Sequence, residues 1–175
     1  MKKKTLALVL ALTLLVAGVV GGTLAWLTDQ TAEVKNTFTV GDINIGLTET
    51  TADYKMVPGN TIAKDPTVTV KANSEACWLF VKVTESTDLK DFITYAIAEG
   101  WTELEAGVYY REVPASAADQ TFSVLAGDAV TVKIDVTRTM LETAKTDAPT
   151  LTFKAYAIQK DHFATADAAW AEVSK

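Results

Sequence analysis

The sequence predicts an all-β protein, a jelly-roll-like antiparallel β-sandwich with a few short helices that follows an N-terminal signal helix. Apolar and polar residues alternate with a period of two in many short segments, the pattern of strands with one buried face. Threonine and valine, whose β-branched side chains favour strands, are abundant after the first 25 residues. Glycine-containing loops separate the segments, and eight or nine strands with such turns are typical of a sandwich.

Residues 1–25 have the plan of a secretory signal peptide. Three lysines occupy positions 2–4, and no charged residue follows until Asp29. A signal peptidase needs small side chains three residues and one residue before the cut, and Thr23 and Ala25 supply them. Cleavage before Trp26 would change the net charge from −6 to −9. An uncleaved anchor is the alternative, because the uncharged stretch is long enough to span a bilayer.

After this leader, the alternation of residue types predicts the strands. Residues 38–47 alternate with a phase change at Gly41, as a β-bulge would produce. Residues 77–83 are mostly apolar at both alternating sets of positions, so this strand should be central and covered on both faces. The other predicted strands are 67–71, 94–98, 101–104, 108–113, 120–125, 129–136 and 151–158.

Glycines and caps predict the connections. Gly100 is expected to form a bulge, and residues 105–107 a three-residue loop with the left-handed conformation at Gly107. Residues 126–128 are expected to close a hairpin between their neighbouring strands. Short helices are predicted over 88–93, 139–145 and 165–173.

The sequence offers little for catalysis or metal binding. It has one histidine and one cysteine, and no GxSxG, P-loop, GxGxxG, CxxC or HExxH motif. His162 is expected on the surface, and Cys77, in an apolar run, as a small buried side chain. We therefore predict no catalytic residue, no metal ligand and no cofactor. A paired-carboxylate glycosidase stays open, because such pairs are assembled in three dimensions.

The acidic composition argues against nucleic acid as a partner, since phosphate binding needs a basic face. The aromatic residues are expected to pack in the core, above all Trp78, Trp101 and Trp170. The alternative for these rings is a sugar-stacking face, in which Tyr109 and Tyr110 would lie beside Trp101.

The residues after the predicted cut form a candidate extended segment. Trp26 would be a bulky ring at a free terminus, which would need a place to dock. Residues 26–35 are polar-rich, contain no glycine or proline, and would reach roughly 33 Å when extended. Such a segment can pair with a sheet edge of its own chain or of a neighbouring molecule. The predicted organisation is a signal peptide (1–25), an extended segment (26–37) and a sandwich domain (38–175).

Several segments of the chain resemble the TasA/camelysin family of Gram-positive bacteria. They are GGTLAWLTDQ, NTFTVGDINIGLTE, VPGNTIAKDPTVTVKANSEACWLFVKV, EGWTELEAGVYYREV and TLTFKAYAIQKD. The resemblance implies a protein secreted to the extracellular matrix or cell surface, whose leader is cut by a SipW-type signal peptidase. The family's processing motif falls on Gly21, Gly22, Thr23, Ala25 and Trp26.

The resemblance also implies a jelly roll that polymerises into biofilm-matrix fibres. The mature N-terminus of one subunit would be the donor strand for the next, which here starts at Trp26 and runs to Phe38, with Leu27 and Val34 between them. The partners would be other copies of the chain and the signal peptidase, and the membrane would be met only through the leader. Some relatives are called metalloproteases, but one histidine leaves no ordinary zinc site, so we expect no enzyme. The alternatives are a monomeric adhesion module and, less favoured, a camelysin-like secreted protease.

Overall fold

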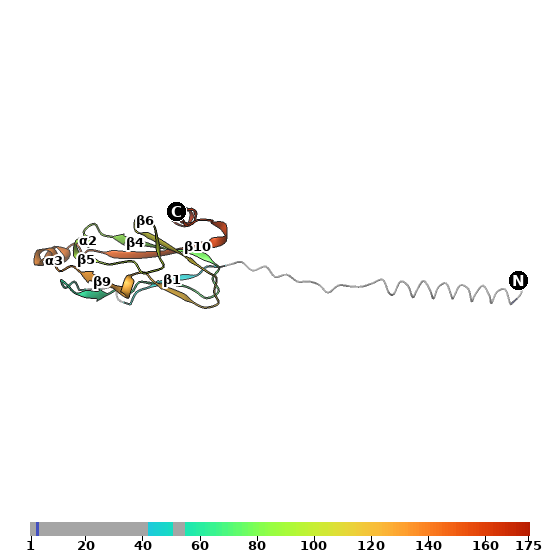
Figure 1. Ribbon diagram of the computed structural model, residues 1–175, viewed down its shortest axis with the longest axis horizontal. Coiled ribbons are helices and arrows are strands. Elements are labelled where there is room, and N and C mark those ends of the chain that lie inside the picture. The colour runs from blue at the N-terminus through green and yellow to red at the C-terminus, as the bar shows by residue number, and fades with distance from the viewer. Residues whose placement is uncertain (1–2, 4–41, 51–54) are drawn as a thin grey trace. The chain divides into compact units, whose positions relative to one another are not determined.

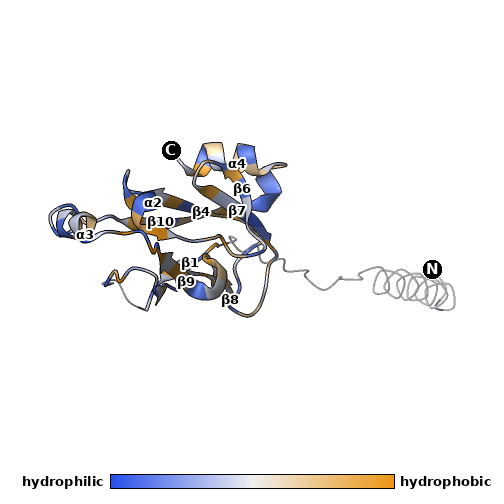
Figure 2. Ribbon diagram, turned by 60° about the vertical axis from the view of Figure 1, so that its left-hand side comes forward, coloured by the Kyte–Doolittle hydropathy of each residue, from blue (hydrophilic) through white to orange (hydrophobic). Residues whose placement is uncertain are grey.

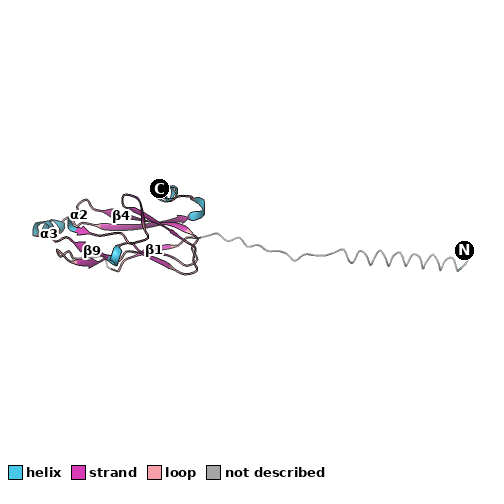
Figure 3. Ribbon diagram, in the orientation of Figure 1, coloured by secondary structure: helices cyan, strands magenta, loops and turns pink. Residues whose placement is uncertain are grey.

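The computed structural model describes Lys3, residues 42–50 and residues 55–175. Ten strands and several short helices are found in this part of the chain, arranged as two layers (Figures 1 and 3). The predicted signal peptide and extended segment, and the bulge expected at Gly41, lie outside the described residues.

One layer is an antiparallel sheet in the order β10-β4-β7-β6. Its longest pair joins β4 to β10 over nine residues of each strand, with Cys77 opposite Gln159 and Glu85 opposite Leu151. The strands of this layer are β4 (Cys77–Glu85), β6 (Thr102–Glu105), β7 (Val108–Val113) and β10 (Leu151–Gln159).

The other layer consists of two three-stranded sheets, β1-β3-β8 and β2-β9-β5. The strands are β1 (Ile45–Thr48), β2 (Thr61–Ala63), β3 (Thr67–Val70), β5 (Ile93–Thr94), β8 (Gln120–Ser123) and β9 (Ala129–Val132). The chain passes from β2 into β3 through a short corner, and from β8 into β9 through a corner at residues 126–128. Backbone hydrogen bonds from Lys64 N to Asp128 O and from Val124 N to Pro66 O connect these corners. The two sheets therefore form one bent layer.

The core has three parts, and two of them cover opposite faces of β4. Leu79, Val81 and Val83 belong to the cluster between the two layers, together with Val68 and Val70 of β3. On the other face, Trp78 and Phe80 belong to a cluster with Trp170. Trp170 lies in the C-terminal helix α4 (Ala166–Val173), which is next to β6 in Figure 2. The third cluster packs β9 against α2 (Leu89–Phe92) and α3 (Arg138–Ala144). This arrangement confirms the prediction that β4 is covered on both faces.

The fold class is also confirmed. The chain changes layer between β3 and β4, β4 and β5, β5 and β6, β7 and β8, and β9 and β10, so each layer is built from distant parts of the sequence. This alternation gives the jelly-roll-like antiparallel sandwich. The helix prediction for the C-terminus holds as well, because Thr165 Oγ1 accepts a 3.3 Å hydrogen bond from Ala168 N and caps α4.

The predicted hairpin around residues 126–128 was wrong. β8 pairs with β3, whereas β9 pairs with β2 and β5, so the two strands do not pair with each other. The short 3₁₀ helix η1 (Ala126–Asp128), with Gly127 at φ 66°, is a corner between the two halves of the bent layer. Val124 and Leu125 are fully buried there, so packing in two different clusters outweighs the local turn pattern.

Smaller differences concern the segment between β5 and β7. The bulge expected at Gly100 is not found there, because Gly100 lies in a turn with φ 84°. The irregular register between β6 and β7 falls between Glu103 and Glu105 instead. The strand predicted over 94–98 is reduced to β5 and an isolated bridge between Ile97 and Leu125. Glu105 pairs with Val108, so the loop between β6 and β7 has two residues, and Gly107 has the expected positive φ of 76°. The short strand β2 was not predicted.

Candidate functional site

The residues that the sequence assigns to function lie outside the described part of the chain. These are the processing residues Gly21, Gly22, Thr23, Ala25 and Trp26, and the donor residues Trp26, Leu27, Val34 and Phe38. Their roles stay predictions. The sandwich domain is described, so the surface that a donor strand would need can be sought there.

The described residues hold few groups suited to chemistry. No cluster of three or more His, Cys, Asp or Glu side chains that could hold a metal ion occurs among them. His162 lies exposed in the short helix η2 (Lys160–His162). Cys77 is completely buried, as predicted, and burial raises its pKa to about 11, so the unreactive thiol form dominates at neutral pH.

Within the described ranges, no helix has the length and apolar character required to cross a membrane.

Two strand edges lie together on one side of the sandwich. Among the described residues, β10 pairs only with β4, and β1 pairs only with β3. The two strands also contact each other across the gap between the layers. An edge strand carries backbone N–H and C=O groups that can accept a further strand. The outer edges of β10 and β1 are therefore candidate sites for an added strand, as are those of β6 and β8 at the other ends of the two sheets.

A groove runs between the edges of β1 and β10. One cavity of about 270 Å³ lies between β1 and β10, and a second of about 500 Å³ continues toward α3. Leu151 and Thr152 border both cavities, so the two are continuous along β10. We call this feature the edge groove and define it by Leu47, Glu49, Lys64, Pro66, Leu151 and Phe153.

Lys64 is a buried cationic group in the edge groove. Only 7% of this residue is exposed, and its Nζ lies 2.6 Å from Oε1 of Glu49 and 5.4 Å from the centroid of Phe153. The corner between β2 and β3 brings it there, held by the bond from Lys64 N to Asp128 O. A buried ammonium group is costly unless it is paired, which explains the short ion pair. No local sequence pattern indicates this role, because Lys64 meets Glu49 and Phe153 only in the folded chain.

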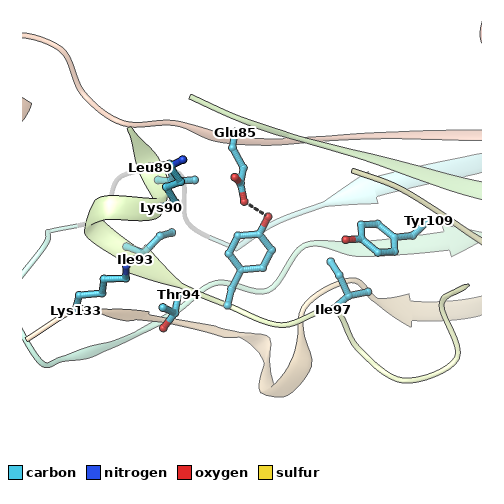
Figure 4. Close-up of a pocket in the computed structure, with 9 residues that line it drawn as sticks. Glu85, Leu89, Lys90, Ile93, Thr94, Ile97, Tyr109 and Lys133 are labelled. Atoms are coloured by element: carbon cyan, nitrogen blue, oxygen red, sulfur yellow. Dashed lines mark hydrogen bonds between the residues drawn. The ribbon is translucent and has the colours of Figure 1, made fainter. Parts of the chain in front are cut away.

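A third cavity, of about 460 Å³, lies between the end of β4, the start of β7 and residues 93–97 (Figure 4). We call it the tyrosine pocket and define it by Glu85, Lys90, Tyr95, Ile97, Tyr109 and Lys133. The hydroxyl of Tyr95 donates a short hydrogen bond to Oε1 of Glu85. Burial, this bond and the negative charge of Glu85 all raise the pKa of Tyr95, and burial followed by nearby carboxylates raises the pKa of Tyr109. Both phenols therefore stay protonated.

The sugar-stacking face left open by the sequence is not formed. Tyr109 packs against the cluster between the layers, whereas Tyr110 packs on the opposite face of β7 beside Trp78 and Phe80. Trp101 is fixed by a different contact, because its Nε1 donates a 2.9 Å hydrogen bond to Ser123 O. The three rings thus do not share one exposed face. The core packing expected for Trp78 and Trp170 is confirmed, with 5% and 8% of each residue exposed.

Comparisons with known proteins give one match. The family model described as camelysin metallo-endopeptidase matches residues 1–154. Neither the curated proteins nor the solved structures contain a match to this chain.

Proposed function

The chain belongs to the camelysin family, and from this membership and the edge groove we propose that it is a secreted structural protein that assembles head-to-tail into extracellular biofilm-matrix fibres. In this proposal residues 26–37 of one copy form a donor strand that pairs with the outer edge of β10 of the next copy. One observation carries the proposal: in the described part of the chain, the long strand β10 has a partner on one side only and borders a partly apolar groove.

The lengths of donor and acceptor agree. β10 has nine residues, which at ~3.4 Å per residue make an edge of about 30 Å. The ten residues 26–35 would extend over roughly 33 Å. One donor segment could therefore satisfy the backbone groups along the whole free edge of β10.

The side chains of the two partners are also complementary. Trp26, Leu27 and Val34 are the apolar candidates within the donor segment. The edge groove offers cavities of about 500 and 270 Å³, bordered by apolar side chains such as Leu151. Burial of one large apolar side chain contributes about 1.5–3 kcal/mol. Two or three such contacts, added to main-chain hydrogen bonds, would make the junction between subunits stable.

The geometry of donation accounts for a filament. A strand given by one copy and received by the next is a heterologous contact, which produces an open chain unless the rotation closes a ring. An edge that receives a donor is also no longer free to pair with unrelated chains. In this proposal, removal of the leader by a SipW-type peptidase frees the donor segment and starts assembly outside a Gram-positive cell.

We further propose that the chain is not an enzyme, although the matching family is described as a metallo-endopeptidase. A catalytic zinc site takes three protein ligands, usually including histidines. The chain has one histidine, His162, and one cysteine, Cys77, which is buried with a raised pKa. This donor set does not fit such a site, and we derive no step through a metal.

Deletion of the donor segment tests the proposal. The chain that starts at Trp26 should form fibres visible by negative-stain electron microscopy, and the chain that starts at Asn36 should stay a monomer in size-exclusion chromatography. Both should show the same β-rich circular dichroism spectrum, because the described sandwich begins after the deleted residues. Fibres from both chains, or from neither, would overturn the proposal.

A further inference from the structure

We propose that the tyrosine pocket binds an acidic sugar, a hexuronate residue of a polysaccharide. This inference does not depend on fibre assembly. Leu89 and Ile93 border both the tyrosine pocket and the larger cavity of the edge groove, but the polar side chains Glu85, Tyr109, Lys90 and Lys133 border the pocket alone. The volume of about 460 Å³ lies within the roughly 300–1,000 Å³ usual for ligand sites.

The first argument concerns the hydroxyl groups of a sugar, each of which both donates and accepts hydrogen bonds. Glu85 accepts one bond from Tyr95, and a carboxylate has about four acceptor positions, so most of its capacity remains. The hydroxyl of Tyr109 points into the cavity (Figure 4) and can donate or accept, because its pKa is raised by burial. Glu85 and Tyr109 can therefore both bind hydroxyls of a sugar in this pocket.

The second argument concerns the apolar surface of the ring. A pyranose has C–H groups on its faces, which pack against aromatic and aliphatic side chains. Tyr95, Tyr109 and Ile97 supply such surfaces in the pocket. The two tyrosines come from opposite layers of the sandwich, so a ring between them would contact both layers.

The third argument concerns charge and selects an acidic sugar over a neutral one. Lys90 of α2 and Lys133 after β9 lie at the opposite end of the pocket from Tyr109 (Figure 4). Among the described residues, no carboxylate lies within ion-pair distance of either lysine. The pocket is lined by two lysines and one carboxylate, that of Glu85, so its formal charge is positive although the chain as a whole has a net charge of −6. A sugar carboxylate at this end would be attracted by both ammonium groups.

Isothermal titration calorimetry can test this inference with the chain that starts at Trp26. The probe is trigalacturonate, and the neutral control ligand is β-1,4-galactotriose. We expect trigalacturonate to bind and the neutral trisaccharide to bind about tenfold more weakly, because it lacks the charged partner of the lysines. The double variant K90Q/K133Q should also lose about tenfold in affinity for trigalacturonate, and Tyr109→Phe should weaken it while keeping the ring.

The matched control is K82Q/K154Q, which removes two exposed lysines from the opposite face of the β4–β10 pair. It should bind trigalacturonate like the parent. Absence of binding by the parent, equal binding of the neutral ligand, or equal loss in both double variants would overturn the inference. Fibre formation by K90Q/K133Q should match the parent, so failure of sugar binding is distinguishable from failure of the fibre proposal.

Discussion

The ammonium group of Lys64 lies 5.4 Å from the centroid of the Phe153 ring, so a residue from the corner of one layer rests on a strand of the other. Glu49 follows β1 and pairs with the same ammonium group at 2.6 Å. Three segments distant in the sequence therefore meet at one point of the edge groove. Through Lys64, the corner between β2 and β3 thus contacts both the residue after β1 and strand β10 at the border of the groove.

Phe153 should matter for stability as well as for the groove. We expect Phe153→Ala to lower the free energy of unfolding by about 2–4 kcal/mol, because it removes the ring that packs on Lys64 and on the core between the layers. Urea denaturation followed by circular dichroism measures the loss. Lys154→Ala, at the exposed next position, should change stability by less than about 1 kcal/mol. A similar effect of both substitutions would contradict the packing described here.

A substitution at Leu47 tests whether the donor strand binds in the edge groove. Its side chain is 37% exposed and borders the groove, so Leu47→Lys should place a charge where the donor must bind and should stop fibre formation. Ile134 is 81% exposed and does not border the groove, so Ile134→Lys is the matched control and should form fibres normally. Electron microscopy distinguishes the two. If Leu47→Lys assembles like Ile134→Lys, the donor binds elsewhere.

Glycine is required at position 107 for two reasons, the positive φ of its backbone and its close approach to the backbone of β4. A Cβ at this position would lie 2.7 Å from Val83 O, whereas at Gly127 it would meet open space. Both glycines have positive φ, so alanine at either site costs roughly 1–2 kcal/mol from backbone strain. Gly107→Ala should therefore be the more destabilising by thermal unfolding. Equal melting temperatures for the two variants would show that β6 and β7 can shift without cost.

Cys77 should make stability depend on pH in the alkaline range. Its pKa is raised from 9.0 to about 11 by burial, so the folded state keeps the proton more tightly than the unfolded state. This stabilisation is fully present below pH 9 and is lost as the pH rises from 9 to about 11. Denaturation at several pH values should show a steeper decline for the parent than for Cys77→Ala. Parallel declines would mean that the thiol is not protected by the fold.

The sequence predicted the elements whose signals are local. The apolar residues at both parities of 77–83 identified the central strand, and Thr165 marked the start of α4. The prediction from the sequence failed where long-range contacts decide which strands pair. Residues 126–128 look like a hairpin loop, but they connect strands with different partners. Strand β2 has three residues and too little pattern to be recognised.

Neither candidate site could be predicted from the sequence, because each is formed by residues that come together only in the folded chain. Leu47, Pro66 and Phe153 of the edge groove come from three different strands or corners, and no motif relates them. Tyr109 stands out in the sequence as one of two adjacent tyrosines, but no local pattern relates it to Tyr95 and Glu85, its neighbours in the pocket. A charged residue such as Lys64 is ordinarily exposed, so its burial follows from the corner geometry alone.

Cross-linking of mixed fibres tests the donor-strand account most directly. Fibres assembled from equal amounts of ¹⁴N- and ¹⁵N-labelled chains are treated with a short amine-reactive linker, and the linked peptides are identified by mass spectrometry. Lys35 lies near the end of the donor segment 26–37, and Lys154 is exposed on β10, so each partner supplies a native lysine. The account predicts Lys35–Lys154 links that combine the two isotopes, and their loss after Leu47→Lys. Links found only within one isotope would show pairing inside a single chain and would contradict it.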